Sequence, residues 1–72
     1  MSKKVQIQVG LRVKELRERD GVSQEQLAHR IGMDRSYLAS IETGSRNVTL
    51  ESLEKIAGGF EVTLAKFFEG IG

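Results

Sequence analysis

The stretch from Ser23 to Glu42, SQEQLAHRIGMDRSYLASIE, carries the clearest signals of the fold. It opens with Ser23, and Gln26 follows three residues later, which is the pattern of a capping box at a helix N-terminus. Gly32 then ends this helix, since glycine accepts the left-handed conformation that follows a last helical turn. Asp34 is a good N-cap for a second helix that starts one residue later. We therefore expect two short helices joined by a tight turn around Gly32.

The segment before this stretch is expected to be a helix from about residue 5 to residue 20. Apolar residues recur there at helical spacing, and Gly21 supplies a stop signal. Residues 5–9 alternate between apolar and polar side chains and would also suit a strand, but a lone strand in so small a domain would lack a partner. We therefore favour a helix, with Gly10 as its weak point.

Two further helices are predicted after the quoted stretch. Thr49 and Thr63 are their N-caps, and Gly58-Gly59 is expected to end the first of them. The inner face of that helix is predicted to consist of Leu50, Leu53, Ile56 and Ala57. The sequence thus predicts an all-α fold of five compactly packed helices, which form one domain over residues 1–72.

The composition excludes several classes of protein. The 72 residues include no cysteine and one histidine, so we expect neither disulfides nor a metal site. No phosphate-cradling glycine loop is present and the core is too small for a pocket, so we expect no enzyme, no cofactor and no small-molecule ligand. No apolar run approaches the length of a membrane span, and no secretory signal is recognisable. These features predict a cytoplasmic protein with no membrane partner.

The net charge of +1 is unevenly distributed. The balance is +3 over residues 1–20, 0 over residues 21–50 and −2 over residues 51–72. Such a distribution would orient the molecule in the field of a polyanion. Ordinary solvated helix faces explain it equally simply, and charge alone favours that explanation. Arg12 and Lys14 are expected to be solvated.

Residues 23–42 together match a helix-turn-helix unit. The second helix of this unit buries Leu38 and Ile41. Its opposite face presents small or hydrogen-bonding side chains, namely Arg35, Ser36, Ala39 and Ser40. An α-helix fits the major groove of double-stranded DNA, and an arginine can bond a guanine with two hydrogen bonds. A polar face turned to solvent is an equally good interpretation of the helix pattern alone.

From Leu11 to Phe68 the chain resembles the DNA-binding domain of phage repressor and Cro-type (XRE-like) proteins. The stretch Asp34–Tyr37, with Ser45–Asn47, is especially similar to the controller proteins of restriction-modification systems. The resemblance rests on the following residues: Leu16-Arg17, Gly21-Val22-Ser23-Gln24-Glu25, Leu27-Ala28, Ile31-Gly32-Met33-Asp34-Arg35-Ser36-Tyr37-Leu38, Ile41-Glu42, Gly44, Arg46-Asn47, Thr49-Leu50 and Leu53.

The resemblance implies a sequence-specific transcriptional regulator that binds a palindromic operator as a dimer, with a recognition helix in the major groove. It could control a restriction-modification operon. The base-reading residues implied are Arg35 and Ser36, with Ala39 and Ser40 lining the groove. The phosphate-binding residues implied are Gln24, Tyr37, Arg46 and Asn47.

Two of the implied phosphate-binding residues also have a structural interpretation. Asn47 could equally well satisfy backbone groups of its loop, and Tyr37 could pack at the edge of the core. The resemblance also implies a partly buried ion pair between Arg17 and Glu42. Glu42 would then fix the recognition helix in place rather than read a base.

The end of the chain carries more apolar groups than one short helix can bury. Two adjacent phenylalanines cannot both face the core, so we expect one of Phe67 and Phe68 to pack inward. The other would join a self-complementary patch of a homodimer, whose predicted interface is Leu64, Phe67 and Phe68. The alternative function is an antitoxin or another protein-interaction module. That class would need an extension that wraps its partner, and little chain follows residue 68.

Overall fold

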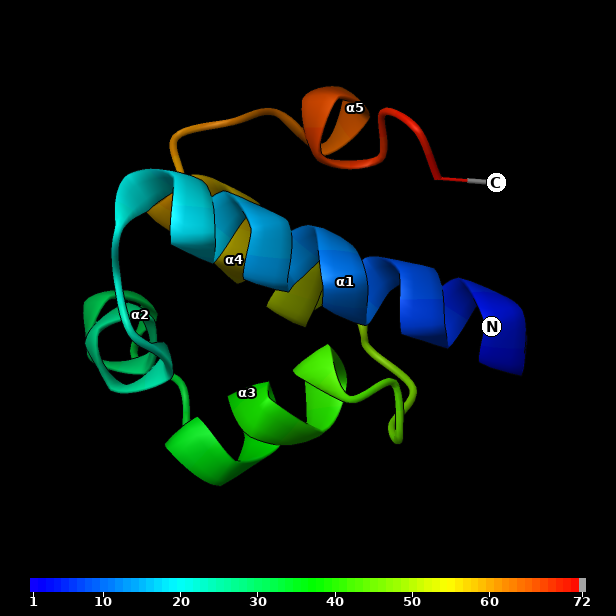
Figure 1. The fold of residues 1–72 in the computed structure, drawn as a ribbon, viewed down its shortest axis with the longest axis horizontal. Coiled ribbons are helices and arrows are strands. Elements are labelled where there is room, and N and C mark those ends of the chain that lie inside the picture. Colours follow the sequence, from blue (N-terminus) through cyan, green and yellow to red (C-terminus); the bar gives the residue numbers. More distant parts are fainter. Residues whose placement is uncertain (72) are drawn as a thin grey trace.

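The computed structural model describes residues 1–71 as five α-helices around one core (Figure 1). The predicted all-α, five-helix fold is confirmed, and no strand occurs within these residues. The predicted domain of residues 1–72 ends on Gly72, which lies outside the described residues. The helices are α1 (Lys3–Asp20), α2 (Gln24–Ile31), α3 (Arg35–Glu42), α4 (Leu50–Gly59) and α5 (Leu64–Phe67).

The first helix is longer than the sequence predicted. Ser2 caps it by accepting a hydrogen bond from the Val5 amide, and Gly21 ends it with a φ of 68°. The alternating residues 5–9 are therefore helical. Gly10, expected to be a weak point, is instead buried where α1 meets α3. A Cβ atom there would lie 2.4 Å from the Ile41 carbonyl oxygen, so only glycine allows this approach.

Helices α2 and α3 form the predicted helix-turn-helix unit. The side chain of Ser23 accepts from the Gln26 amide at 3.0 Å, and the Gln26 side chain accepts from the Ser23 amide at 2.8 Å. These two bonds complete the capping box. Gly32 ends α2 with a φ of 64°, and Asp34 caps α3.

Thr49 caps helix α4 as predicted, but the end of the helix and its inner face differ from the prediction. Gly58 and Gly59 lie inside it, and the chain turns only at Glu61, which has a φ of 58°. Gly59 packs against α2, because a Cβ atom there would lie 2.5 Å from Ile31 Cγ2. Leu50, predicted to face inward, is 71% exposed. The inner face of α4 therefore starts one turn later, at Leu53.

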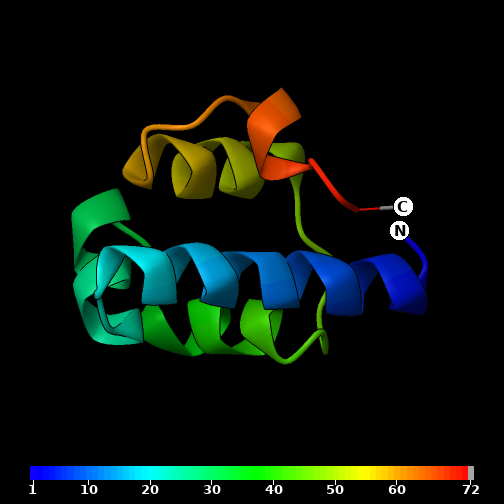
Figure 2. The same ribbon diagram turned by 45° about the horizontal axis from the view of Figure 1, so that its top comes forward.

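The core lies between the helices, with α3 on one side of α1 and α4 with α5 on the other (Figure 2). None of the helices described in residues 1–71 is both long enough and apolar enough to span a membrane. The buried apolar residues are Val9, Val13, Leu16, Leu27, Ala28, Leu38, Ile41, Leu53, Ile56, Ala57, Phe60 and Phe67.

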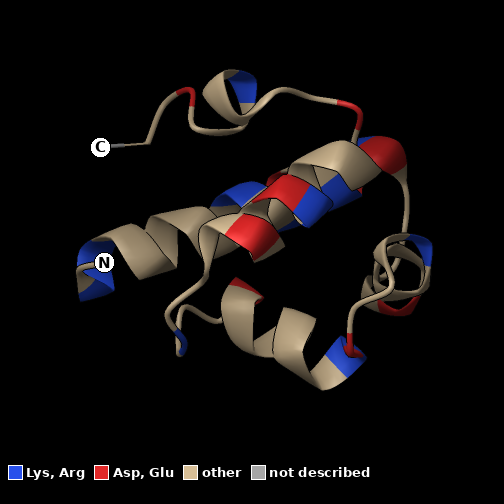
Figure 3. Ribbon diagram, turned by 180° about the vertical axis from the view of Figure 1, so that it is seen from behind, with Lys and Arg blue, Asp and Glu red and all other residues tan. Residues whose placement is uncertain are grey.

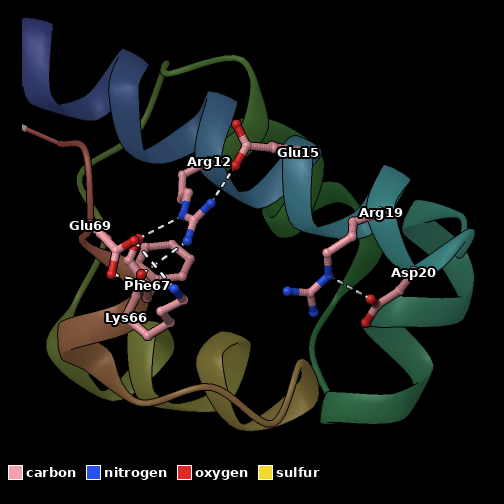
Figure 4. Close-up of polar contacts among 7 residues, drawn as sticks. All are labelled: Arg12, Glu15, Arg19, Asp20, Lys66, Phe67 and Glu69. Carbon is pink, nitrogen blue, oxygen red and sulfur yellow. Dashed lines mark hydrogen bonds and ion pairs between the residues drawn. The ribbon is translucent and has the colours of Figure 1, made fainter.

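The short helix α5 is attached to α1 by Arg12, which we had expected to be solvated. Its Nε donates to the Phe67 carbonyl at 2.8 Å and its Nη2 donates to the Lys66 carbonyl at 2.9 Å (Figure 4). Both carbonyls lie at the C-terminal end of α5, where carbonyls attract a cation, and the Lys66 carbonyl also accepts from the Glu69 amide at 3.2 Å. Lys14 is exposed, as predicted.

The two phenylalanines divide as predicted, one inward and one toward the surface. Phe67 is completely buried and Phe68 is half-buried, with their rings edge to face at a centroid distance of 5.3 Å. Phe67 therefore belongs to the core of its own subunit. Its place in the predicted dimer interface is wrong, because a fully buried ring has no surface to offer a second copy.

Candidate nucleic-acid interface

The N-terminal turn of α3 lies at the surface of the helix-turn-helix unit. Arg35 and Ser36 are exposed, and Ala39 one turn later is half-buried. Asp34 holds this turn, since its side chain accepts from the Tyr37 amide at 3.1 Å. The opposite face of α3 is anchored by Leu38 and Ile41, which are fully buried. The structure thus presents an arginine and a serine on a helix whose back is fixed to the core.

Ser40 does not offer its hydroxyl to an outside partner as the sequence suggested. Its Oγ donates to the Tyr37 carbonyl at 2.6 Å and accepts from Arg46 Nε at 3.0 Å. A hydroxyl has one hydrogen to donate, and that hydrogen is used inside the helix. Ser40 therefore holds Arg46 in this structure, and its base-reading role stays a prediction.

Tyr37 also contributes to holding Arg46. The Arg46 guanidinium carbon lies 5.1 Å from the centroid of the Tyr37 ring, within the range of a cation–π contact. The Tyr37 hydroxyl lies 3.2 Å from Ser52 Oγ at the start of α4. Arg46 itself remains exposed. Its charge is thus held at the edge of α3 without being buried.

Arg17 and Glu42 form the expected ion pair between α1 and α3. Arg17 Nε donates to Glu42 Oε2 at 2.9 Å and Nη2 donates to Oε1 at 3.1 Å. The side chains are 16% and 4% exposed. The hydrogen bond with Glu42 raises the pKa of Arg17, because it stabilises the charged guanidinium. Arg17 Nη1 also donates to the Val22 carbonyl at 3.0 Å. The same side chain therefore holds the residue that precedes the helix-turn-helix unit.

Gln24 connects this ion pair to the surface. Its Nε2 donates to Glu42 Oε1 at 3.1 Å. An amide nitrogen carries two hydrogens, so one remains for an acceptor outside the molecule. Gln24 is also the first residue of α2, where unpaired amides and the helix dipole favour an anion.

The loop between α3 and α4 (residues 43–49) is held by the start of α1, which the sequence did not reveal. Lys3 Nζ donates to the Gly44 carbonyl at 2.7 Å, and Gln6 Nε2 donates to Asn47 Oδ1. Lys3 and Gln6 each lie 41 residues from their partners in the sequence. No local pattern signals a contact over such a separation.

Basic residues occur at the start of α3, in the loop that follows it and in the part of α1 that contacts this loop. Figure 3 shows lysine or arginine at the start of α1, in the loop between α3 and α4 and at the start of α3. The start of α3 also carries the acidic cap Asp34. The structure therefore combines an exposed N-terminus of α3 with a cationic side chain near each end of that helix. These are Arg35 at its start and Arg46 in the loop that follows it.

Residues 13–67 match the helix-turn-helix family HTH_3. The chain belongs to this helix-turn-helix family. Control protein C.MunI from a Mycoplasma species is 46% identical over 68 residues, which cover 93% of this chain and 92% of that protein. The predicted resemblance to controller proteins and phage repressors is thereby confirmed.

Two solved structures extend this similarity to the fold. The controller protein C.AhdI from Aeromonas hydrophila superposes with a TM-score of 0.84 at 40% identity, covering 88% of this chain and 91% of that chain. A tetramer of the controller protein C.Esp1396I in complex with its natural 35 base-pair operator gives a TM-score of 0.84 at 42% identity. That match covers 90% of this chain and 86% of that chain.

Membership of the helix-turn-helix family makes the protein a DNA-binding transcription regulator. The family is one of regulators and not of enzymes. Helices α2 and α3 are its helix-turn-helix pair, and α3 stands in the position of the recognition helix.

Proposed function

We propose that this protein is a restriction-modification controller that binds a palindromic operator as a homodimer, with α3 in the major groove. The observation that carries the proposal is the similarity to controller proteins over nearly their whole length, together with an α3 whose N-terminal turn is exposed. Two copies are needed because one short helix contacts only a few base pairs. Two half-sites about one helical turn apart double the contact.

The base-reading residues of the proposal are Arg35 and Ser36. Arg35 is exposed at the first position of α3 and can reach guanine with two parallel hydrogen bonds. Ser36 offers a hydroxyl that can donate or accept. Ala39, one turn on, is small enough to let the helix approach closely, and its methyl group can contact a thymine methyl.

The phosphate-binding residues of the proposal flank α3 on both sides. Gln24 would donate its second amide hydrogen at the N-terminus of α2. On the other side, Arg46 and Asn47 would reach the backbone, and Tyr37 would act mainly through Arg46, which lies over its ring. Phosphate contacts of this kind position the protein but carry no sequence information.

The homodimer would use the apolar surface around α5. Leu64 and Phe68 are half-buried and pack at the margin of the core, and Val62 and Ile71 lie there as well. A second copy could cover these partly exposed groups. Sedimentation at micromolar concentration would test this, and a Phe68→Ser variant should shift the population toward the monomer. A wild-type protein that sediments as a monomer would oppose the dimer.

Selection of bound duplexes from a random DNA library tests the proposed function directly. Enrichment of a palindrome with half-sites about one turn apart is expected. Arg35→Ala should then weaken binding to the selected duplex by about 1–3 kcal/mol and relax the preference at one base pair of each half-site. Binding without enrichment, or no binding, would contradict the proposal and favour a protein-interaction module.

A further inference from the structure

We propose that the first two turns of α1 position the loop between α3 and α4 for contact with the DNA backbone, with Gln6 orienting the Asn47 side chain. This inference rests on the proposed function, since it adds positioning residues to the same interface. Lys3 and Gln6 lie outside residues 13–67, the part of the chain that matches the helix-turn-helix family.

The loop is attached to α1 at three contacts. Lys3 Nζ donates to the Gly44 carbonyl at 2.7 Å, and Gln6 donates to Asn47 Oδ1. Ile7 also packs against buried Gly44, where a Cβ atom would lie 2.8 Å from Ile7 Cγ1. Gly44 has a φ of 72°, which favours glycine, so the loop can turn directly onto the helix. Figure 2 shows this loop passing beside the N-terminal half of α1.

The hydrogen bond from Gln6 decides which end of the Asn47 amide faces outward. An asparagine amide has one accepting oxygen and one nitrogen with two hydrogens. Because Gln6 donates to Oδ1, the oxygen is turned toward α1 and the nitrogen is left for another partner. A phosphate oxygen can only accept. This orientation suits a phosphate, whereas a reversed amide would present its oxygen to an anion.

Lys3 contributes in a second way. Its ammonium group is held against Gly44, two residues before Arg46, so a cation of α1 is fixed to the loop that carries Arg46. Lys4 is the neighbouring residue, is exposed and carries the same charge. Lys3 and Lys4 therefore form a matched pair, in which one cation is fixed to the loop.

A double-mutant cycle on binding to duplex DNA tests the role of Gln6. The probe is a duplex of about 30 base pairs of mixed sequence, because a backbone contact needs no particular operator. Gln6→Ala and Asn47→Ala should each weaken binding about threefold to tenfold, the range for one hydrogen bond. The double variant should bind no more weakly than Asn47→Ala alone. A merely destabilised protein would instead lose affinity in both backgrounds.

The salt dependence of binding tests the role of Lys3. Lys3→Met should weaken binding more than Lys4→Met, and it should reduce the slope of log affinity against log salt by about one. Gln6→Ala removes no charge and should leave that slope unchanged. Equal binding by Gln6→Ala and the wild type, additive effects in the cycle, or equal effects at Lys3 and Lys4 would overturn the proposal. Failure of the wild type to bind any duplex would overturn the proposed function as well.

Discussion

Helix α1 is fixed to the rest of the molecule by an arginine on each of two sides, and the two arginines differ in their partners. On the side of α3, Arg17 pairs with Glu42, a carboxylate that is only 4% exposed. On the side of α5, Arg12 donates to two backbone carbonyls and pairs with Glu15, whose side chain is 67% exposed. The recognition helix is therefore held by a buried carboxylate, and α5 by hydrogen bonds from Arg12 to two neutral backbone carbonyls.

This difference predicts which substitutions should lower the free energy of unfolding most. When one partner of a buried ion pair is removed, the remaining charge is left without compensation. A neutral backbone carbonyl that loses one hydrogen bond gives up less, because no charge is left unpaired. Both sets of contacts come from arginine side chains on α1, but their removal should lower stability by different amounts.

The largest effect is expected from Glu42→Gln on the α3 side. The substitution removes the charge that Arg17 and Gln24 both bind, and breaking such a buried pair costs about 3 kcal/mol or more. Urea denaturation should show this loss, and DNA affinity should fall as well because α3 and Gln24 lose their anchor. If both stability and affinity were unchanged, Glu42 would have no role in holding the recognition helix.

The next effect is expected from Gly10→Ala, where α1 approaches α3 most closely. The new Cβ atom would lie 2.4 Å from the Ile41 carbonyl oxygen and 2.6 Å from that of Glu42, so the helices must separate. Overpacking of this kind costs about 2–3 kcal/mol. Gly58→Ala is the matched control, because its Cβ would meet no atom within 4 Å. It should raise stability by about 0.5–1 kcal/mol, as expected for glycine replaced inside a helix. Shifts of the thermal unfolding midpoint in opposite directions for the two variants would support the close approach of α1 and α3 at Gly10.

A smaller effect is expected from Arg12→Met on the α5 side. Methionine keeps most of the apolar stem, so the loss should be limited to the bonds with Phe67 and Lys66, about 1 kcal/mol. Arg19→Met serves as the control, since its pair with Asp20 is 51% exposed at the arginine (Figure 4). That variant should change stability by less than about 0.5 kcal/mol. A loss at Arg12 as large as that at Glu42 would contradict the contrast between the two sides.

The sequence predicted those parts of the candidate site that depend on local signals. The capping box of α2, the Asp34 cap of α3 and Gly32 at the turn between them placed both helices correctly, because these signals act within a few residues. The Arg17–Glu42 pair was expected only through resemblance to a family. The loop contacts of Lys3 and Gln6, and the use of the Ser40 hydroxyl by its own helix, were not expected.

The sequence alone predicts the set of helices, most of their ends and the face that α3 presents. It can do so because caps, stop signals and apolar periodicity are properties of neighbouring residues. How those helices meet became clear only from the tertiary structure. Gly10 is required by the backbone of α3, Arg12 is bound by the end of α5, and Asn47 is oriented by Gln6. Each of these facts depends on groups that folding brings together from distant parts of the chain, and no pattern along the sequence encodes their approach.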